Sequence, residues 1–200
     1  MSNERQFVWV RYQNANADHE RQRLLIAARK AVGTPPGTVP EVWPIYTSTT
    51  QAGIAAEHVV AGIWGTHQQG DPRPVHAART KGIQWRSNFG GACRELFDAQ
   101  FSGNAQIRSP IDTMADDTIS SRLAVLSRTD EVDVAASHIT GLVRLMRSTG
   151  THIAFNYDDL YWAIRDWNEP DKRTATMYRW SRSYFHTQSK QAAEPVSAEG

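Results

Sequence analysis

The stretch Glu131–Trp167, EVDVAASHITGLVRLMRSTGTHIAFNYDDLYWAIRDW, carries the clearest helical pattern in the chain. Its first half predicts a helix over about residues 131–148 that ends at Gly150. The apolar face of that helix consists of Val132, Ala135, Ala136, Ile139, Leu142, Val143 and Met146. Asn156 can cap a second helix, because the residues after it are apolar at helical spacing. These residues are Tyr157, Leu160, Tyr161, Ile164 and Trp167. Two such helices predict a packed helical bundle.

Similar patterns cover most of the remaining chain, and none of them has the alternation of a strand. We expect further helices over about residues 4–14, 17–32, 51–67, 89–101 and 171–186, and one that begins at Asp116 or Asp117 and ends near Ser127. The apolar side of the second helix should carry Leu24, Leu25, Ala28 and Val32. Two irregular stretches, 68–87 and 102–112, separate the helices. The predicted fold class is therefore all-α, without a β-sheet.

The composition excludes several classes of protein. With 200 residues and 40% hydrophobic content, the chain can bury a sizeable core. No apolar run approaches the roughly 18 residues needed to cross a bilayer, and residues 1–9 lack the layout of a signal peptide. Cys93 is the single cysteine, so an internal disulfide is impossible. We therefore expect a cytoplasmic protein without a membrane partner.

Charge is distributed unevenly, although the net charge is only +1. Five basic residues and no acid lie between Arg73 and Arg94, and five more basic residues and no acid lie between Lys172 and Lys190. An acidic stretch separates these two segments. Segregated basic segments can form a local surface for phosphate groups. The alternative is that both segments are ordinary solvated faces.

Patterns that usually carry catalytic chemistry are incomplete in this sequence. Two acidic pairs, 116–117 and 158–159, stand where helices begin, so capping explains them better than metal binding. Trp162 occupies the position at which a prenyl-pyrophosphate enzyme would need a third carboxylate. His58 lies in an apolar helix and is expected to be a core histidine, and nothing next to Cys93 suggests activation. We expect no catalytic residue, cofactor or metal.

Arginines on helix faces are the remaining candidates. Arg144 and Arg147 are three residues apart and point away from the apolar face of their helix. Along the last helix, Arg179 and Arg182 form a basic stripe with Lys172. Arginine interleaved with aromatic residues, as around Arg94, suits contact with the backbone and bases of single-stranded nucleic acid. For any one of these arginines, a solvated surface is an equally good reading.

Taken in order, several segments resemble the small subunit of the type I-E CRISPR interference complex, Cascade (the CasB family). The best matches lie in the second half of the chain, and Ala163 departs from the family pattern, which has Asp there. The segments that carry the resemblance are Leu24–Pro44, Val60–His67, Asn88–Arg94, Arg122–Leu126, Leu142–Met146, Phe155–Trp167 and Trp180–Tyr184.

The resemblance implies an all-α protein of two small helical bundles without catalytic activity. We divide the chain into an N-terminal helical domain over residues 1–108, a C-terminal bundle over 113–187 and a disordered tail over 188–200. The family members are subunits of an RNA-guided ribonucleoprotein in antiviral defence. They contact the backbone subunits that coat the guide RNA, the large subunit and a second copy of themselves.

Members of the family also contact target DNA and help hold the strand displaced from the R-loop. Carried over by motif, the resemblance makes Arg29, Lys30, Arg94, Arg122, Arg144 and Arg147 the candidate nucleic-acid contacts, and the basic stripe adds Arg179 and Arg182. A helix-turn-helix regulator is the nearest rival, but it would need side chains reaching base edges from the start of a recognition helix. A purely structural scaffold subunit is the other alternative.

Overall fold

The computed structural model describes residues 6–78, 87–102, 110–113 and 117–185, and within these ranges it contains helices but no strand. The elements are α1 (Val8–Asn14), α2 (Asp18–Lys30), the 3₁₀ helix η1 (Pro40–Ile45), α3 (Gln51–Gln68), α4 (Phe89–Phe101), the 3₁₀ helix η2 (Pro110–Thr113), α5 (Thr118–Leu126), α6 (Val132–Ser148), α7 (Tyr157–Arg165) and α8 (Pro170–Phe185). The all-α prediction is confirmed.

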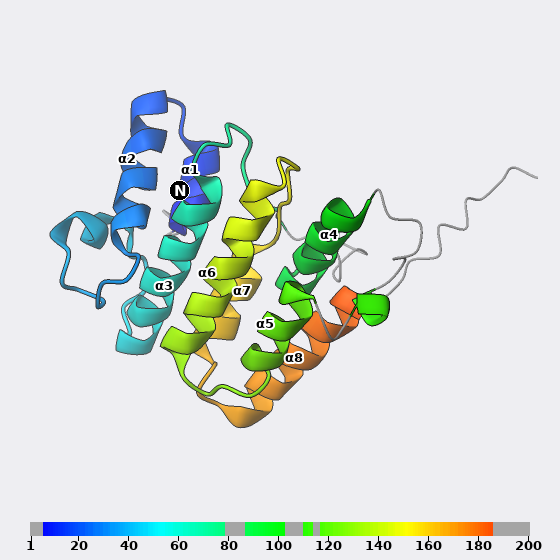
Figure 1. Cartoon of the computed structure of the whole chain (residues 1–200). Helices are drawn as coiled ribbons and strands as arrows, with labels where there is room; N and C mark the ends of the chain where they lie inside the picture. The colour runs from blue at the N-terminus through cyan, green and yellow to red at the C-terminus, as the bar shows by residue number, and fades with distance from the viewer. Residues whose placement is uncertain (1–5, 79–86, 103–109, 114–116, 186–200) are drawn as a thin grey trace, which may run out of the picture.

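The long apolar helix α3 lies near the middle of the helices. It packs against α2 on one side, α6 on the other and α7 behind, while α5 packs on α6 and α4 packs on α8. Figure 1 shows α2, α3, α6 and α5 side by side, with α7 behind α6. The apolar pattern of α3 on most of its faces is explained by this position, because three neighbouring helices cover it.

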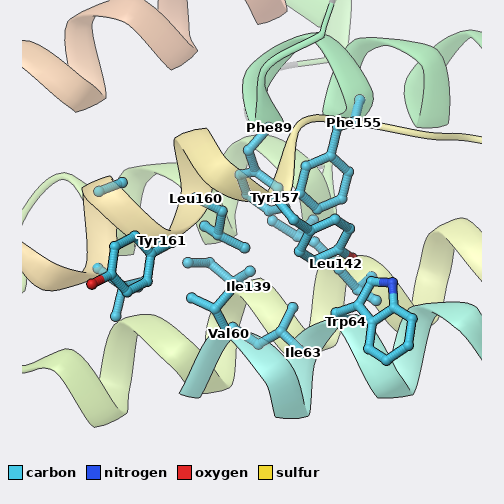
Figure 2. Packing of buried hydrophobic residues seen from close by; sticks show 14 of the residues in the cluster. Val60, Ile63, Trp64, Phe89, Ile139, Leu142, Phe155, Tyr157, Leu160 and Tyr161 are labelled. Carbon is cyan, nitrogen blue, oxygen red and sulfur yellow. The ribbon is translucent and has the colours of Figure 1, made fainter. Parts of the chain in front are cut away.

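The core is built where α3, α6 and α7 meet. Figure 2 shows Val60 and Trp64 of α3 facing Leu142 of α6 and Tyr157 of α7, with Phe155 stacked on the Tyr157 ring at a centroid distance of 4.3 Å. The same buried cluster continues from Val8 and Trp9 of α1 to Trp180 and Tyr184 of α8. Helices from both sides of residue 108 contribute to it, and the division into domains at that point stays a prediction.

Helix ends agree closely with the caps read from the sequence. The Asp117 side chain accepts hydrogen bonds from the backbone N–H groups of Ile119 and Ser120 at 3.0 and 2.9 Å, so it caps α5. Asn156 caps α7 by accepting from the Asp159 N–H at 2.9 Å. Gly150, with φ of +70°, follows the end of α6, a backbone conformation that glycine adopts readily.

The structure corrects several details. The side chain of Val32 is exposed rather than part of the apolar side of α2, because the helix ends at Lys30 and the chain turns away. Asp158 does more than favour the start of α7: its carboxylate accepts a hydrogen bond from the buried Trp9 indole at 2.7 Å. Residues 110–113, expected to be irregular, form the short 3₁₀ helix η2. The expected tail, 188–200, lies outside the residues described.

Glycine permits the closest contact between two helices. A Cβ added at Gly90 in α4 would overlap the carbonyl oxygen of Trp180 in α8 and lie 2.5 Å from its Cα. The backbones of α4 and α8 therefore touch at this point. The Gly90–Gly91 pair, which fits no phosphate-binding motif, has a packing explanation here.

The segment between α6 and α7 holds two separate parts of the chain, residues 75–77 and Ser87, by backbone hydrogen bonds. Phe155 donates its N–H to the Val75 carbonyl at 3.1 Å and accepts from the Ala77 N–H at 2.9 Å. The next residue, Asn156, donates its N–H to the Ser87 carbonyl at 2.6 Å. We call this arrangement the 155–156 clip.

Candidate nucleic-acid interface

Arg144 and Arg147 both project from the exposed side of α6, one turn apart. Neither has an ion-pair partner among the residues that the structure describes. The opposite face of α6 is buried in the core, so the helix presents the two guanidinium groups without depending on them for packing. The two side chains nevertheless line different hollows.

Arg144 lines a groove of about 770 Å³ between α3 and α6. Small residues of α3, among them Ala52, Ala55 and Gly62, line this space, and Val32, just after α2, borders it. Other lining residues are Asp133, Ala136, Thr140 and Arg165. Asp133 lies 11 residues before Arg144, three helical turns away, so no acid of α6 neutralises this cation.

Arg147 lines a second hollow of about 470 Å³, where α3 and α6 both end. Its Nη2 atom lies 3.9 Å from the position of a Cβ on Gly70. Asp71 also lines this hollow, but Arg73 and His152 bind it at 3.1 and 2.9 Å. The hydrogen bond from Arg73 holds the pKa of Asp71 well below its usual range. This carboxylate is therefore already paired, which leaves Arg147 free for another anion.

Arg122 reaches from α5 across α6. A Cβ added at Gly141 would overlap its guanidinium group, with Cζ at 2.7 Å and Nη2 at 3.1 Å. Like Arg144, Arg122 has no ion-pair partner within the described ranges. Gly141 and Arg144 are three residues apart on one helix and are neighbours on its surface. We call Arg122, Arg144 and Arg147 the cationic row.

The other candidates on α2 differ in their availability. Arg29 is exposed, and its backbone nitrogen lies 3.0 Å from a Cβ position on Gly65 of α3. Lys30 is bound to Glu41 at 2.5 Å. That hydrogen bond lowers the pKa of the Glu41 carboxyl. Lys30 would have to leave this partner to bind a phosphate.

The candidates on α4 and α8 form a separate group. Arg94 is mostly covered: its Nε binds Asp98 at 2.8 Å, and its guanidinium lies over the Phe97 ring. Arg179 and Arg182 are exposed and have no ion-pair partner in the described part of the chain, whereas Lys172 binds Asp166 and Glu169. The basic residues Arg79, Lys81, Arg86 and His186 lie outside the described residues.

Sequence reasoning missed two features of this surface. Gly141 gave a weak signal, a glycine inside a helical pattern, which often has a packing or functional reason. Trp162 is about half exposed, and the Arg165 guanidinium lies 4.0 Å from its ring centroid. Asp166 binds Arg165 at 2.6 Å and holds it there. An exposed tryptophan is therefore already stacked with a cation of its own helix.

The cysteine and two histidines that could carry catalytic chemistry are buried in the fold. Burial raises the pKa of the Cys93 thiol well above its ordinary value, so the thiolate is disfavoured. Burial lowers the pKa of His67 to about 3, and its Nδ1 is hydrogen-bonded to the Tyr157 hydroxyl at 2.8 Å. His58 is a buried histidine bonded to Tyr46 and to the Thr34 carbonyl, as expected.

No group of three histidine, cysteine or acidic side chains among the residues that the structure describes is placed to hold a metal ion. None of their helices is long and apolar enough to cross a bilayer.

Comparison with known proteins gives both a family and a fold. The profile of the family described as CRISPR-associated protein Cse2 matches residues 25–185. The structure is similar to the crystal structure of CasB from Thermobifida fusca, with a TM-score of 0.60, 15% identity, and coverage of 88% of this chain and 94% of that chain. It is also similar to CasB from M. ruber, with a TM-score of 0.59, 17% identity and coverage of 88% and 89%. Among curated proteins, no sequence matches.

Proposed function

The chain belongs to the CRISPR-associated Cse2 (CasB) family, and from this premise we propose that it binds DNA backbone and stabilises the target R-loop. It is a small subunit of the type I-E Cascade assembly in CRISPR defence. The observation that supports the finer proposal is the cationic row: three arginines on adjacent helices, exposed or half-exposed, that form no ion pair with an acid among the residues the structure describes.

Arginines of this kind suit phosphate groups. A guanidinium presents several donors in a fixed plane and forms strong, often bidentate, hydrogen bonds to phosphate oxygens. Phosphates carry no base identity, so contacts of this kind do not read sequence. No helix of the described chain carries the row at its first turn, where a helix-turn-helix protein places its base contacts. We therefore favour non-specific backbone contact over sequence-specific regulation.

Modest contacts are sufficient for such a role. Forming an R-loop exchanges a DNA duplex for a guide–target duplex of about equal stability, so protein contacts can tip the balance. About 3 kcal/mol from a few arginines shifts the equilibrium roughly a hundredfold, at about 1.4 kcal/mol per tenfold. We propose that this subunit supplies part of that energy beside the other Cascade subunits and the displaced strand, without a catalytic step or cofactor.

The test replaces Arg144 and Arg147 together by Ala in the assembled complex. Both side chains are exposed, so the free energy of unfolding should change by less than about 1 kcal/mol. Affinity for target DNA should fall about tenfold, and the log–log salt dependence should become shallower by about 0.7–0.9 for each lost phosphate contact. Co-purification of the other subunits should be unchanged.

A matched control removes the same charge elsewhere. Arg23 and Arg128 are exposed, have no ion-pair partner in the described residues and lie outside the cationic row. Their double replacement by Ala should leave target affinity within about twofold. Equal affinities for both double variants and the wild-type chain would favour a purely structural scaffold. Failure of only the Arg144/Arg147 variant to assemble would place these arginines in a protein interface.

A further inference from the structure

Gly141 occupies an unusual place in α6. It lies well inside a 17-residue helix that is otherwise regular. Glycine is, after proline, the least favourable residue for a helix interior. At Gly90 the three atoms nearest to an added Cβ belong to the backbone of another helix, whereas at Gly141 the three nearest belong to the end of one flexible side chain, that of Arg122.

That side chain takes the space of the missing Cβ. Arg122 starts on α5, and its Cζ, Nη1 and Nη2 atoms all lie within 3.1 Å of the Cβ position on Gly141. With any other residue at 141, the guanidinium could not lie against the backbone of α6. It would move away from the helix surface.

The consequence concerns the spacing of two cations. Arg144 is one turn beyond Gly141, and residues three apart on a helix have Cβ atoms about 5–6 Å from each other. The Arg122 guanidinium, held over Gly141, is therefore close to the Cβ atom of Arg144. From this position the Arg144 guanidinium can turn toward that of Arg122, where the two like charges repel each other unless an anion lies between them. No acid from the described residues forms an ion pair with either arginine.

We infer that Gly141 is a positioning residue, which seats the Arg122 guanidinium on α6 so that Arg122 and Arg144 together bind one phosphodiester group. The inference rests on the proposed function and deepens it, because it makes one two-arginine site out of two separate cations. Gly141 itself contacts no ligand in this arrangement. Its effect on binding comes only from the space that its missing Cβ leaves for the Arg122 guanidinium.

The test is Gly141→Ala in the full-length chain, with two measurements. In thermal unfolding, alanine should raise the midpoint by about 2–4 °C, because it favours the helix and only a flexible side-chain end has to move. Binding of a 20-nucleotide oligothymidylate, measured by fluorescence anisotropy, should weaken about three- to tenfold. The loss should equal that of Arg122→Ala, and combining the two changes should cause no further loss.

A glycine required only for packing would behave differently. In that case Gly141→Ala would bind the oligonucleotide as the wild type does while Arg122→Ala binds it more weakly, which overturns the role of Gly141 and leaves the proposed function standing. If the wild-type chain and complex do not bind DNA, or if Arg122→Ala and Arg144→Ala bind it unchanged, the proposed function fails and the inference with it.

A second measurement keeps the inference testable if Gly141→Ala does not fold. Arg122→Ala and Arg144→Ala leave the glycine in place and can be combined in a double-mutant cycle. Two arginines on one phosphate should be coupled, so the double variant should lose at least about threefold less affinity than the product of the single losses. Strictly multiplicative losses would mean separate contacts and would overturn the shared site.

Discussion

Replacing Asp117 by Ala should destabilise the fold strongly, because this buried carboxylate joins two helices. It caps α5 through the N–H groups of Ile119 and Ser120, and it accepts a hydrogen bond from the Tyr184 hydroxyl of α8 at 2.6 Å. Loss of an N-cap costs about 0.5–2 kcal/mol, and loss of a hydrogen bond to a charged group about 1.5–3 kcal/mol. We therefore expect a loss of about 3 kcal/mol.

Urea unfolding followed by circular dichroism measures this loss, and the thermal midpoint should fall by about 6–12 °C for a chain of this size. Asp130→Ala, at an exposed position between α5 and α6, is the control and should stay within about 0.5 kcal/mol. Tyr184→Phe removes only the link to α8 and should show coupling to Asp117→Ala in a double-mutant cycle. A loss below 1 kcal/mol for Asp117→Ala would refute the reasoning.

Two further changes test the packing and the buried histidine. Gly90→Ala should cost about 3 kcal/mol, since the added methyl meets the backbone of Trp180 rather than a flexible side chain; a thermal midpoint equal to that of the wild type would contradict the close crossing. Burial holds the pKa of His67 near 3, below its unfolded value of about 6.5, so protonation favours the unfolded chain and stability should fall as the pH drops below 6.5. By pH 5 the free energy of unfolding, measured in urea titrations, should have fallen by about 2 kcal/mol because of His67. The variant His67→Gln does not titrate, so its free energy of unfolding should depend less on pH.

The helices could be predicted from the sequence because their signals are local. Asn156 and Asp117 cap α7 and α5 through the backbone two or three residues ahead, and Gly150 follows the end of α6. The residues of α3 are apolar on most faces of the helix, a pattern that is typical of a helix surrounded by others. These features depend on neighbours in the chain, so a single sequence contains them.

The arrangement of the candidate site depends on contacts between distant segments, and the sequence does not contain these. Arg144 and Arg147 looked like one pair, but the neighbours of α6 place them in two different hollows. Lys30 and Arg94 looked as available as Arg122, yet Glu41 and Asp98 bind them. Whether a cation has a partner is decided by tertiary structure, and spacing along a helix cannot reveal it.

The 155–156 clip affects how easily the length of the chain between Ala77 and Ser87 can change in evolution. Ala77 and Ser87 are held by two consecutive residues, Phe155 and Asn156, so these two positions of the chain lie close together. A segment between two fixed attachment points can change its length at little cost, since doubling a loop adds only about 0.6 kcal/mol of closure entropy. Residues 78–86, which carry Arg79, Lys81 and Arg86, can therefore be lengthened or shortened at little cost in stability, while the core and the cationic row keep their geometry.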